Sequence, residues 1–178
     1  MASDQTLSDV ERRLLAGWAA DCASRVLPLF EADPPADEQI RDALARARAY
    51  GDGESTAAEE IRKRMIAVKA AGAATTTAGA AAARSVGQAA AVAHMGAHAF
   101  GAAAYAVKAV SLANPQRPEA IEEEVSWQVA HARDDARAAL RLLPPVGEGS
   151  GGPLGPGLLS RGLLGAVIRD LQTRIRVD

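Results

Sequence analysis

A stretch of 23 residues without a formally charged side chain, Ser85 to Val107, constrains the fold of this chain most strongly. It reads SVGQAAAVAHMGAHAFGAAAYAV, mostly Ala and Gly, with His94 and His98 four residues apart. Such a segment is buried in lipid or among helices, and a membrane span needs roughly 20 mostly apolar residues. Ala and Gly contribute little transfer energy, and no belt of Trp and Tyr flanks the segment. We therefore expect a central helix enclosed by other helices and no membrane span.

The composition predicts an all-α protein with a core of small residues. Forty-two of the 178 residues are Ala, and aromatic residues make up only 3%. Ala has the highest helix propensity, and β-branched residues never alternate here over four or more positions, as a strand requires. We expect a compact Ala-rich bundle of about five helices around one long central helix.

Charge and cysteine content limit the partners and the compartment. The net charge is −2, so no overall positive field favours nucleic acid or an anionic membrane. The single cysteine, Cys22, excludes an internal disulfide and suits a reducing compartment. The first residues, MASDQTLSDVERR, lack the basic and then apolar layout of a secretory signal. We therefore expect a cytoplasmic protein, and a homo-oligomer is left open.

Capping residues and helix breakers place the expected helices. Ser8 with Glu11, and Thr56 with Glu59, form capping-box patterns at two helix starts. Pro and Gly pairs and a run of three threonines separate the later segments. The expected helices run from about 8 to 30, 36 to 50, 56 to 72, 78 to 113 and 118 to 143.

The composition changes after the last of these helices. Residues 146–157 read VGEGSGGPLGPG, which is typical of a flexible linker. Leucine, valine and isoleucine then recur at helical spacing from Leu159 to Ile175 and predict an amphipathic helix. We divide the chain into a helical-bundle domain (1–143), a linker (144–157) and an appended helix (158–178). That helix docks on its own core, on another subunit or on a partner.

The histidines suggest one chemical alternative. His94 and His98 have the spacing with which two imidazoles share a metal ion, and His131 is a candidate third ligand. The zincin pattern requires Glu directly after the first His, where this chain has Met95, and no Glu-x-x-His step of di-iron bundles occurs. We expect buried histidines without a metal or other cofactor. The alternative is a metal-dependent helical hydrolase that uses all three histidines.

Three segments resemble bacterial immunity proteins associated with polymorphic toxin systems. They are RRLLAGWAADCASRVLPLFE (12–31), AVAHMGAHAFGAAAYAVKAV (91–110) and EEEVSWQVAHAR (122–133). The resemblance covers residues 14–142. The positions that carry it are Trp18, Cys22, Pro28, Phe30, Glu31, His94, His98, Gly101, Tyr105 and Trp127.

The resemblance implies an all-helical domain that binds and neutralises a cognate toxin by protein contact, without catalysis. Acidic clusters would steer such a protein towards a basic toxin. We take Glu122, Glu123 and Trp127 as the candidate contact, because Trp127 lies off the apolar stripe of its helix. Two alternatives stay open: the hydrolase described above, and a membrane-associated helper that uses the 85–107 segment and the last helix.

Overall fold

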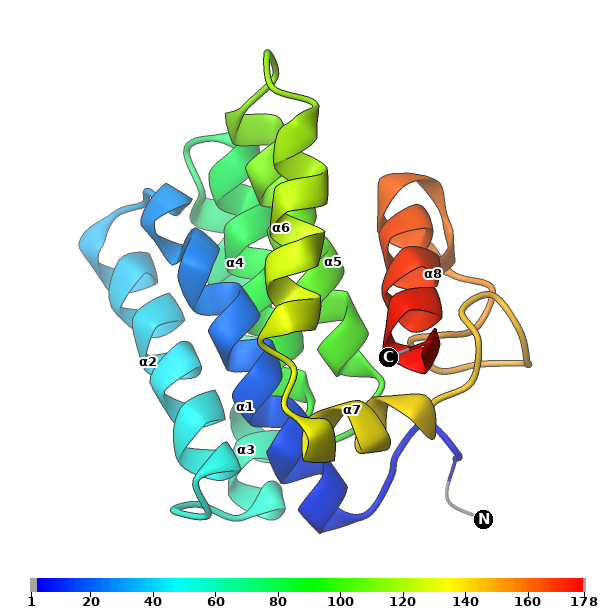
Figure 1. Cartoon of the computed structure of the whole chain (residues 1–178). Helices are drawn as coiled ribbons and strands as arrows, with labels where there is room; N and C mark the ends of the chain where they lie inside the picture. Colours follow the sequence, from blue (N-terminus) through cyan, green and yellow to red (C-terminus); the bar gives the residue numbers. More distant parts are fainter. Residues whose placement is uncertain (1–2, 178) are drawn as a thin grey trace.

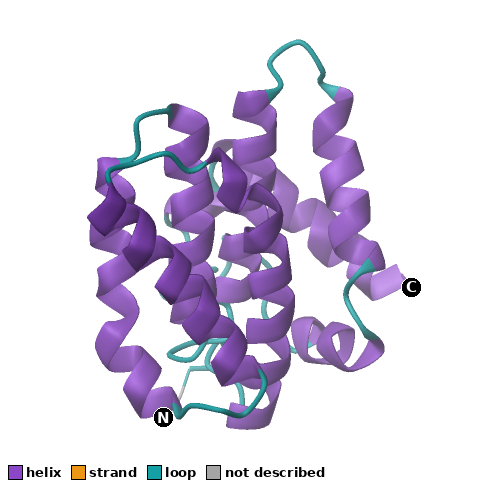
Figure 2. Cartoon of the chain, turned by 90° about the vertical axis from the view of Figure 1, so that its left-hand side faces the viewer, coloured by secondary structure: helices purple, strands orange, loops and turns teal. Residues whose placement is uncertain are grey.

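The computed structural model describes residues 3–177, which form α-helices and short 3-10 turns and no strand (Figure 1). This confirms the all-α class. The α-helices of the described range are α1 (Asp9–Val26), α2 (Pro34–Gly51), α3 (Ala57–Ala70), α4 (Thr77–Ala91), α5 (His98–Ala113), α6 (Glu119–Ala130), α7 (Asp134–Arg141) and α8 (Gly162–Val177). Figure 2 shows the same helices joined mostly by short loops.

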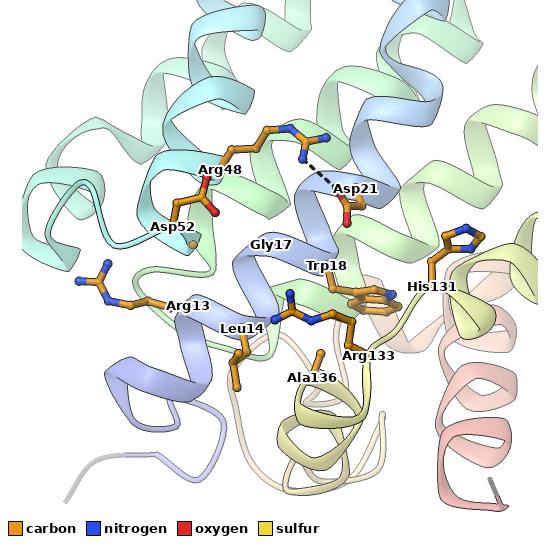
Figure 3. Close-up of a pocket in the computed structure, with 11 residues that line it drawn as sticks. Arg13, Leu14, Gly17, Trp18, Asp21, Arg48, Asp52, His131, Arg133 and Ala136 are labelled. Carbon is orange, nitrogen blue, oxygen red and sulfur yellow. Dashed lines mark hydrogen bonds and ion pairs between the residues drawn. The ribbon is translucent and has the colours of Figure 1, made fainter.

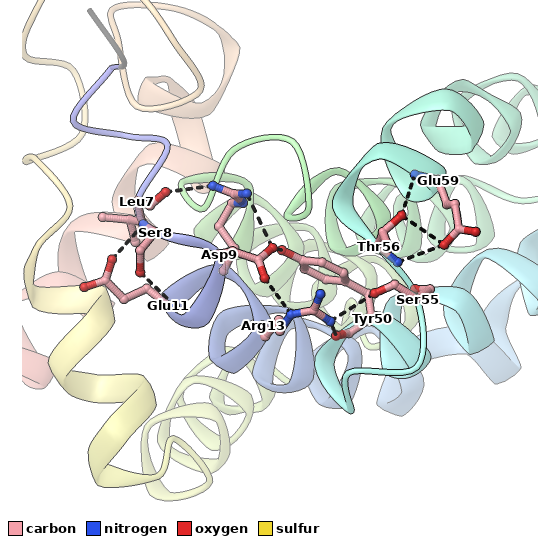
Figure 4. A network of polar contacts seen from close by, with 10 residues as sticks. Leu7, Ser8, Asp9, Glu11, Arg13, Tyr50, Ser55, Thr56 and Glu59 are labelled. Carbon is pink, nitrogen blue, oxygen red and sulfur yellow. Dashed lines mark hydrogen bonds and ion pairs between the residues drawn. The ribbon is translucent and has the colours of Figure 1, made fainter.

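Both predicted capping boxes form, and they begin α1 and α3. The Ser8 side chain accepts a hydrogen bond from the Glu11 amide, and the Thr56 side chain accepts one from the Glu59 amide. In return, the carboxylate of each glutamate accepts a hydrogen bond from the backbone amide of Ser8 or Thr56. Arg13 connects these two helix starts, because its guanidinium donates to the carbonyl oxygens of Tyr50 (2.7 Å) and Ser55 (3.0 Å) (Figure 4). The network fixes α1 against the end of α2 and the turn that precedes α3.

The core consists largely of alanine, as the composition predicts. The uncharged segment supplies its centre, since every residue from Ala99 to Val107 is buried. α4 and α5 pack along each other, and the Ser85 hydroxyl donates to the Ala102 carbonyl oxygen at 2.7 Å. Small side chains allow this close approach of two backbones. No helix within residues 3–177 combines the length and hydropathy needed to cross a membrane.

The expected single helix from 78 to 113 is wrong, because the chain reverses direction between Val92 and Ala97. The N-terminal segment enters the break, where the Gly96 amide donates to the Thr6 carbonyl oxygen and the Ala97 amide to that of Gln5, both at 3.0 Å. A Cβ atom at Gly96 would lie 3.0 Å from the Leu7 side chain, so only glycine fits there comfortably. The helix propensity of the local sequence favoured one continuous helix, but the contact with Gln5 and Thr6, about ninety residues earlier in the chain, divides it into two.

The expected helix from 118 to 143 is also two helices, α6 and α7. Arg133 has an extended backbone (φ −63°, ψ 159°) at the start of α7, which turns the chain across the lower end of the bundle in Figure 1. Arg137 stabilises the break, because its guanidinium donates to the carbonyl oxygens of Val129 (2.7 Å) and Ala132 (2.8 Å). These bonds satisfy backbone acceptors that a continuous helix would have satisfied itself.

The C-terminal segment packs against the bundle. α8 contacts α5, α6 and α7 and buries the apolar stripe predicted for it. The residues before it are held by Gln5, which donates to the Gly151 carbonyl oxygen (2.7 Å) and accepts from the Leu154 amide (2.9 Å). The last helix was expected to dock on its own core, on another subunit or on a partner, and in the structure it docks on its own core. The division into 1–143, 144–157 and 158–178 stays a prediction.

Candidate functional site

His94 and His98 lie at the reversal between α4 and α5. His98 is the first residue of α5, and its Nδ1 donates to Oε1 of Gln88 on α4 at 2.9 Å. Burial, together with the nearby charges of His94 and Arg64, lowers the pKa of His98 to about 4. His94 is exposed. His98 is therefore a neutral, hydrogen-bonded residue that joins the two central helices. The expectation that the histidines are buried is wrong for His94 and also for His131, which is exposed.

His131 lies elsewhere, at the end of α6. Its ring stacks on Trp127 at 3.9 Å between centroids, and its Nδ1 donates to the Trp127 carbonyl oxygen at 2.8 Å. Between residues 3 and 177, no three His, Cys, Asp or Glu side chains are grouped so that they could hold one metal ion. The structure thus does not bring His131 together with His94 and His98.

The low pKa of His98 predicts a pH-dependent stability. Below pH 6.5 the unfolded chain binds a proton at His98, whereas the folded chain binds it only near pH 4. The free energy of unfolding should therefore fall by about 2 kcal/mol more between pH 6.5 and 4.5 in the native protein than in His98→Gln. Urea unfolding across this range measures the difference. Parallel pH profiles for the two proteins would contradict it.

Trp127 is held between two partners on the surface of α6. The Arg25 guanidinium lies over its ring at 3.9 Å, and His131 stacks on it as described above. Arg25 also binds both carboxylate oxygens of Glu124, at 2.9 Å for the closest pair. The Glu124 side chain is only 5% exposed, so this ion pair compensates a buried charge. The stack presents a rigid, half-buried aromatic group of the kind found at the centre of protein interfaces.

A pocket of about 190 Å³ lies near this stack, between α1, the end of α2 and the α6–α7 connection (Figure 3). Trp18 and His131 contribute aromatic walls, and Arg48 at the opposite side donates to Asp21 at 2.8 Å. The lining residues are Arg13, Leu14, Gly17, Trp18, Asp21, Arg48, Gly51, Asp52, His131, Arg133 and Ala136. This set offers hydrogen bonds, charge and aromatic contact, and it contains no Ser, Thr, Cys or Lys nucleophile.

The other two candidate contact residues already bind arginines of the same chain. Glu122 accepts two hydrogen bonds from Arg174 of α8, and this pairing, with a bond from Ser126, lowers the pKa of its carboxyl group to about 2. Glu123 pairs with Arg117 at 2.9 Å. Both carboxylates are exposed, but a cation of any binding partner would have to compete with these guanidinium groups.

The remaining signature residues mainly hold helices together. Trp18 donates to the Gln128 carbonyl oxygen at 3.0 Å and meets Phe100 edge to face. A Cβ atom at Gly101 would collide with Gln88, the partner of His98. Burial raises the pKa values of the Cys22 thiol and the Tyr105 hydroxyl group. Phe30 is buried, whereas Pro28 and Glu31 lie exposed on the connection between α1 and α2.

Sequence reasoning did not find the partners of these residues. Arg25 and Glu124 are separated by 99 positions, and Gln88 was one polar residue in an apolar segment. No local spacing indicates either contact. The only available signal was that an isolated polar residue in an apolar helix normally requires a hydrogen-bond partner.

The sequence matches one protein-family model over most of its length. Residues 5–135 match the model of the Imm-5 like putative immunity protein family, which therefore covers α1 to α6 and ends at the start of α7. No curated protein and no solved structure shows significant similarity to the chain. The match extends over most of the chain and includes every signature position discussed above, so the chain belongs to the Imm-5 like immunity protein family.

Proposed function

We propose that this protein is a bacterial immunity protein that binds a cognate toxin of a polymorphic toxin system and neutralises it by contact, without catalysis. The observation that carries this proposal is the family match over residues 5–135. Family membership implies a protein partner, and immunity by binding requires only a rigid surface that covers or distorts the toxin's site. We place this action in the cytoplasm, where the toxin would reach its target.

The packing of the chain supports a binding role. Its helices are joined by buried hydrogen bonds, such as those of Ser85 and Trp18, around a core of buried side chains. Tight toxin–inhibitor pairs use such rigid surfaces, with about 1,600 Å² buried and a few central anchors. The hydrolase alternative requires His94, His98 and His131 in one site, an arrangement that residues 3–177 do not form.

A survival assay tests the proposal. The toxin gene that neighbours the gene for this protein is induced in a bacterial host, with and without co-expression of this protein. We expect growth to be restored by the native chain and a stable complex to be recovered from the cells. Growth arrest that persists despite abundant folded protein, with no complex, would contradict the proposal.

The candidate contact at Glu122, Glu123 and Trp127 stays a prediction, and the same assay examines it. Trp127→Ala removes the aromatic group that stacks between Arg25 and His131, while Trp127→Phe keeps a ring there. If this surface meets the toxin, the alanine variant should protect at least tenfold less well than the phenylalanine variant at equal protein level.

A further inference from the structure

The α3 helix exposes its large apolar side chains. Met65, Ile66 and Val68 are 48%, 38% and 52% exposed, whereas the residues that α3 buries are Glu60, Ala67 and Ala70. A surface helix normally turns its large apolar residues inward. Met65 and Val68 are three residues apart and so project from the same side of α3, where a contiguous apolar patch would serve as an interaction site.

From Ile61 to Pro118 the charged side chains are all basic. No Asp or Glu occurs between Glu60 and Glu119, a span that contains most of α3 and all of α4 and α5. Seven basic residues lie in it: Arg62, Lys63, Arg64, Lys69, Arg84, Lys108 and Arg117. The chain as a whole has a net charge of −2, so the rest of it carries −9. The low net charge of the whole chain therefore results from a basic middle segment and an acidic remainder of the sequence.

Residues of the three helices meet at one hollow of the surface. Val68 of α3, Arg84, Gly87 and Gln88 of α4 and Tyr105 of α5 line one hollow of about 190 Å³. Lys69 directly follows Val68, and Lys108 lies about one turn beyond Tyr105 on α5. We call Met65, Val68, Lys69, Arg84 and Lys108 the α3–α5 face.

The cations of this face are not neutralised within the chain. Lys69, Arg84 and Lys108 form no ion pair with any residue of the described part of the chain. Glu122 and Glu123, in contrast, are already bound by Arg174 and Arg117. A partner carboxylate that approached the α3–α5 face would therefore gain a charge contact without displacing an existing one.

We propose that the α3–α5 face binds an acidic surface of the toxin, with carboxylates of the toxin around an apolar centre. This inference rests on the proposed function and assigns its contact surface. Exposed Met65 and Val68, with Arg84 beside Val68, resemble the composition of a protein interface, in which Met and Arg are enriched. Binding of single-stranded nucleic acid uses exposed aromatic rings, whereas Tyr105 is buried here. α3 also lacks the Trp, Phe and Leu of a helix that inserts into a lipid surface.

The test measures the affinity of the full chain for the purified, catalytically inactivated toxin encoded beside its gene. The double variant Lys69→Glu and Arg84→Glu reverses two exposed cations of the face. The matched control, Arg161→Glu and Arg176→Glu, makes the same change of charge at two exposed arginines outside it. We expect the first variant to raise Kd at least tenfold, mainly through slower association, and the control to stay within twofold.

The outcomes separate this inference from the proposed function. Absence of any complex with the native chain would refute the proposed function and the contact surface with it. A complex that Lys69→Glu with Arg84→Glu leaves unchanged would overturn the surface alone, most clearly if Trp127→Ala weakens it. Loss of a homodimer, or of binding to phosphatidylserine vesicles, in the double variant with unchanged toxin affinity would likewise overturn the assignment.

Discussion

Replacing Trp18 with alanine is expected to lower the free energy of unfolding by about 3–5 kcal/mol. Trp18 is only 3% exposed, meets Phe100 edge to face and donates to the Gln128 backbone at 3.0 Å. The substitution leaves a cavity between α1, α5 and α6 and removes the hydrogen bond that joins α1 to α6. Chemical denaturation monitored by circular dichroism measures the loss.

The matched control for this prediction is Val10→Ala on the same helix. Val10 is 69% exposed, so its truncation should change the free energy of unfolding by less than about 0.5 kcal/mol. Trp18→Phe should lie between the two, because it keeps an aromatic ring and loses the donor. An equal, small effect at positions 18 and 10 would show that Trp18 does not anchor the core.

Two glycines of α4 should respond in opposite directions to the same substitution. A Cβ atom at Gly79 would lie 2.7 Å from the Leu29 carbonyl oxygen, which belongs to the backbone and cannot turn aside. Gly79→Ala is therefore expected to destabilise the protein by about 1–3 kcal/mol. At Gly87 the nearest atom is 3.8 Å away, so Gly87→Ala should be neutral or stabilise by up to about 1 kcal/mol through helix propensity.

Thermal unfolding of the two alanine variants, measured side by side, tests the close approach of α4 to the turn after α1. The predicted order is a lower Tm for Gly79→Ala and an equal or higher Tm for Gly87→Ala than for the native chain. Since both variants add the same methyl group to the same helix, a common sign would contradict this steric explanation.

The helix starts and the class of the fold were predictable because their causes are local. Ser8 with Glu11 and Thr56 with Glu59 satisfy backbone donors a few residues away, so the pattern alone identifies them. The breaks near Gly96 and Arg133 depend on Gln5, Thr6 and the guanidinium of Arg137. An alanine-rich segment has high helix propensity throughout, so its sequence does not indicate that tertiary contacts will interrupt the helix.

The candidate sites show the same division between local and distant causes. Helical spacing placed His94 near His98, but it could not show that Gln88 would bind His98 or that His131 would stack on Trp127. The sequence contains the apolar residues of α3 but does not show that their side chains are exposed. Their orientation follows from which face α3 turns to α2 and α4, a choice that buries Ala67 and Ala70.

The stoichiometry of neutralisation tests the central claim, immunity by binding without catalysis, most directly. A fixed amount of the neighbouring toxin is titrated with this protein, and the residual toxin activity and the mass of the toxin are measured. The account predicts a linear loss of activity that ends near one equivalent, with the toxin mass unchanged. Complete inactivation at a small fraction of an equivalent, or a toxin altered in mass, would show catalysis and contradict it.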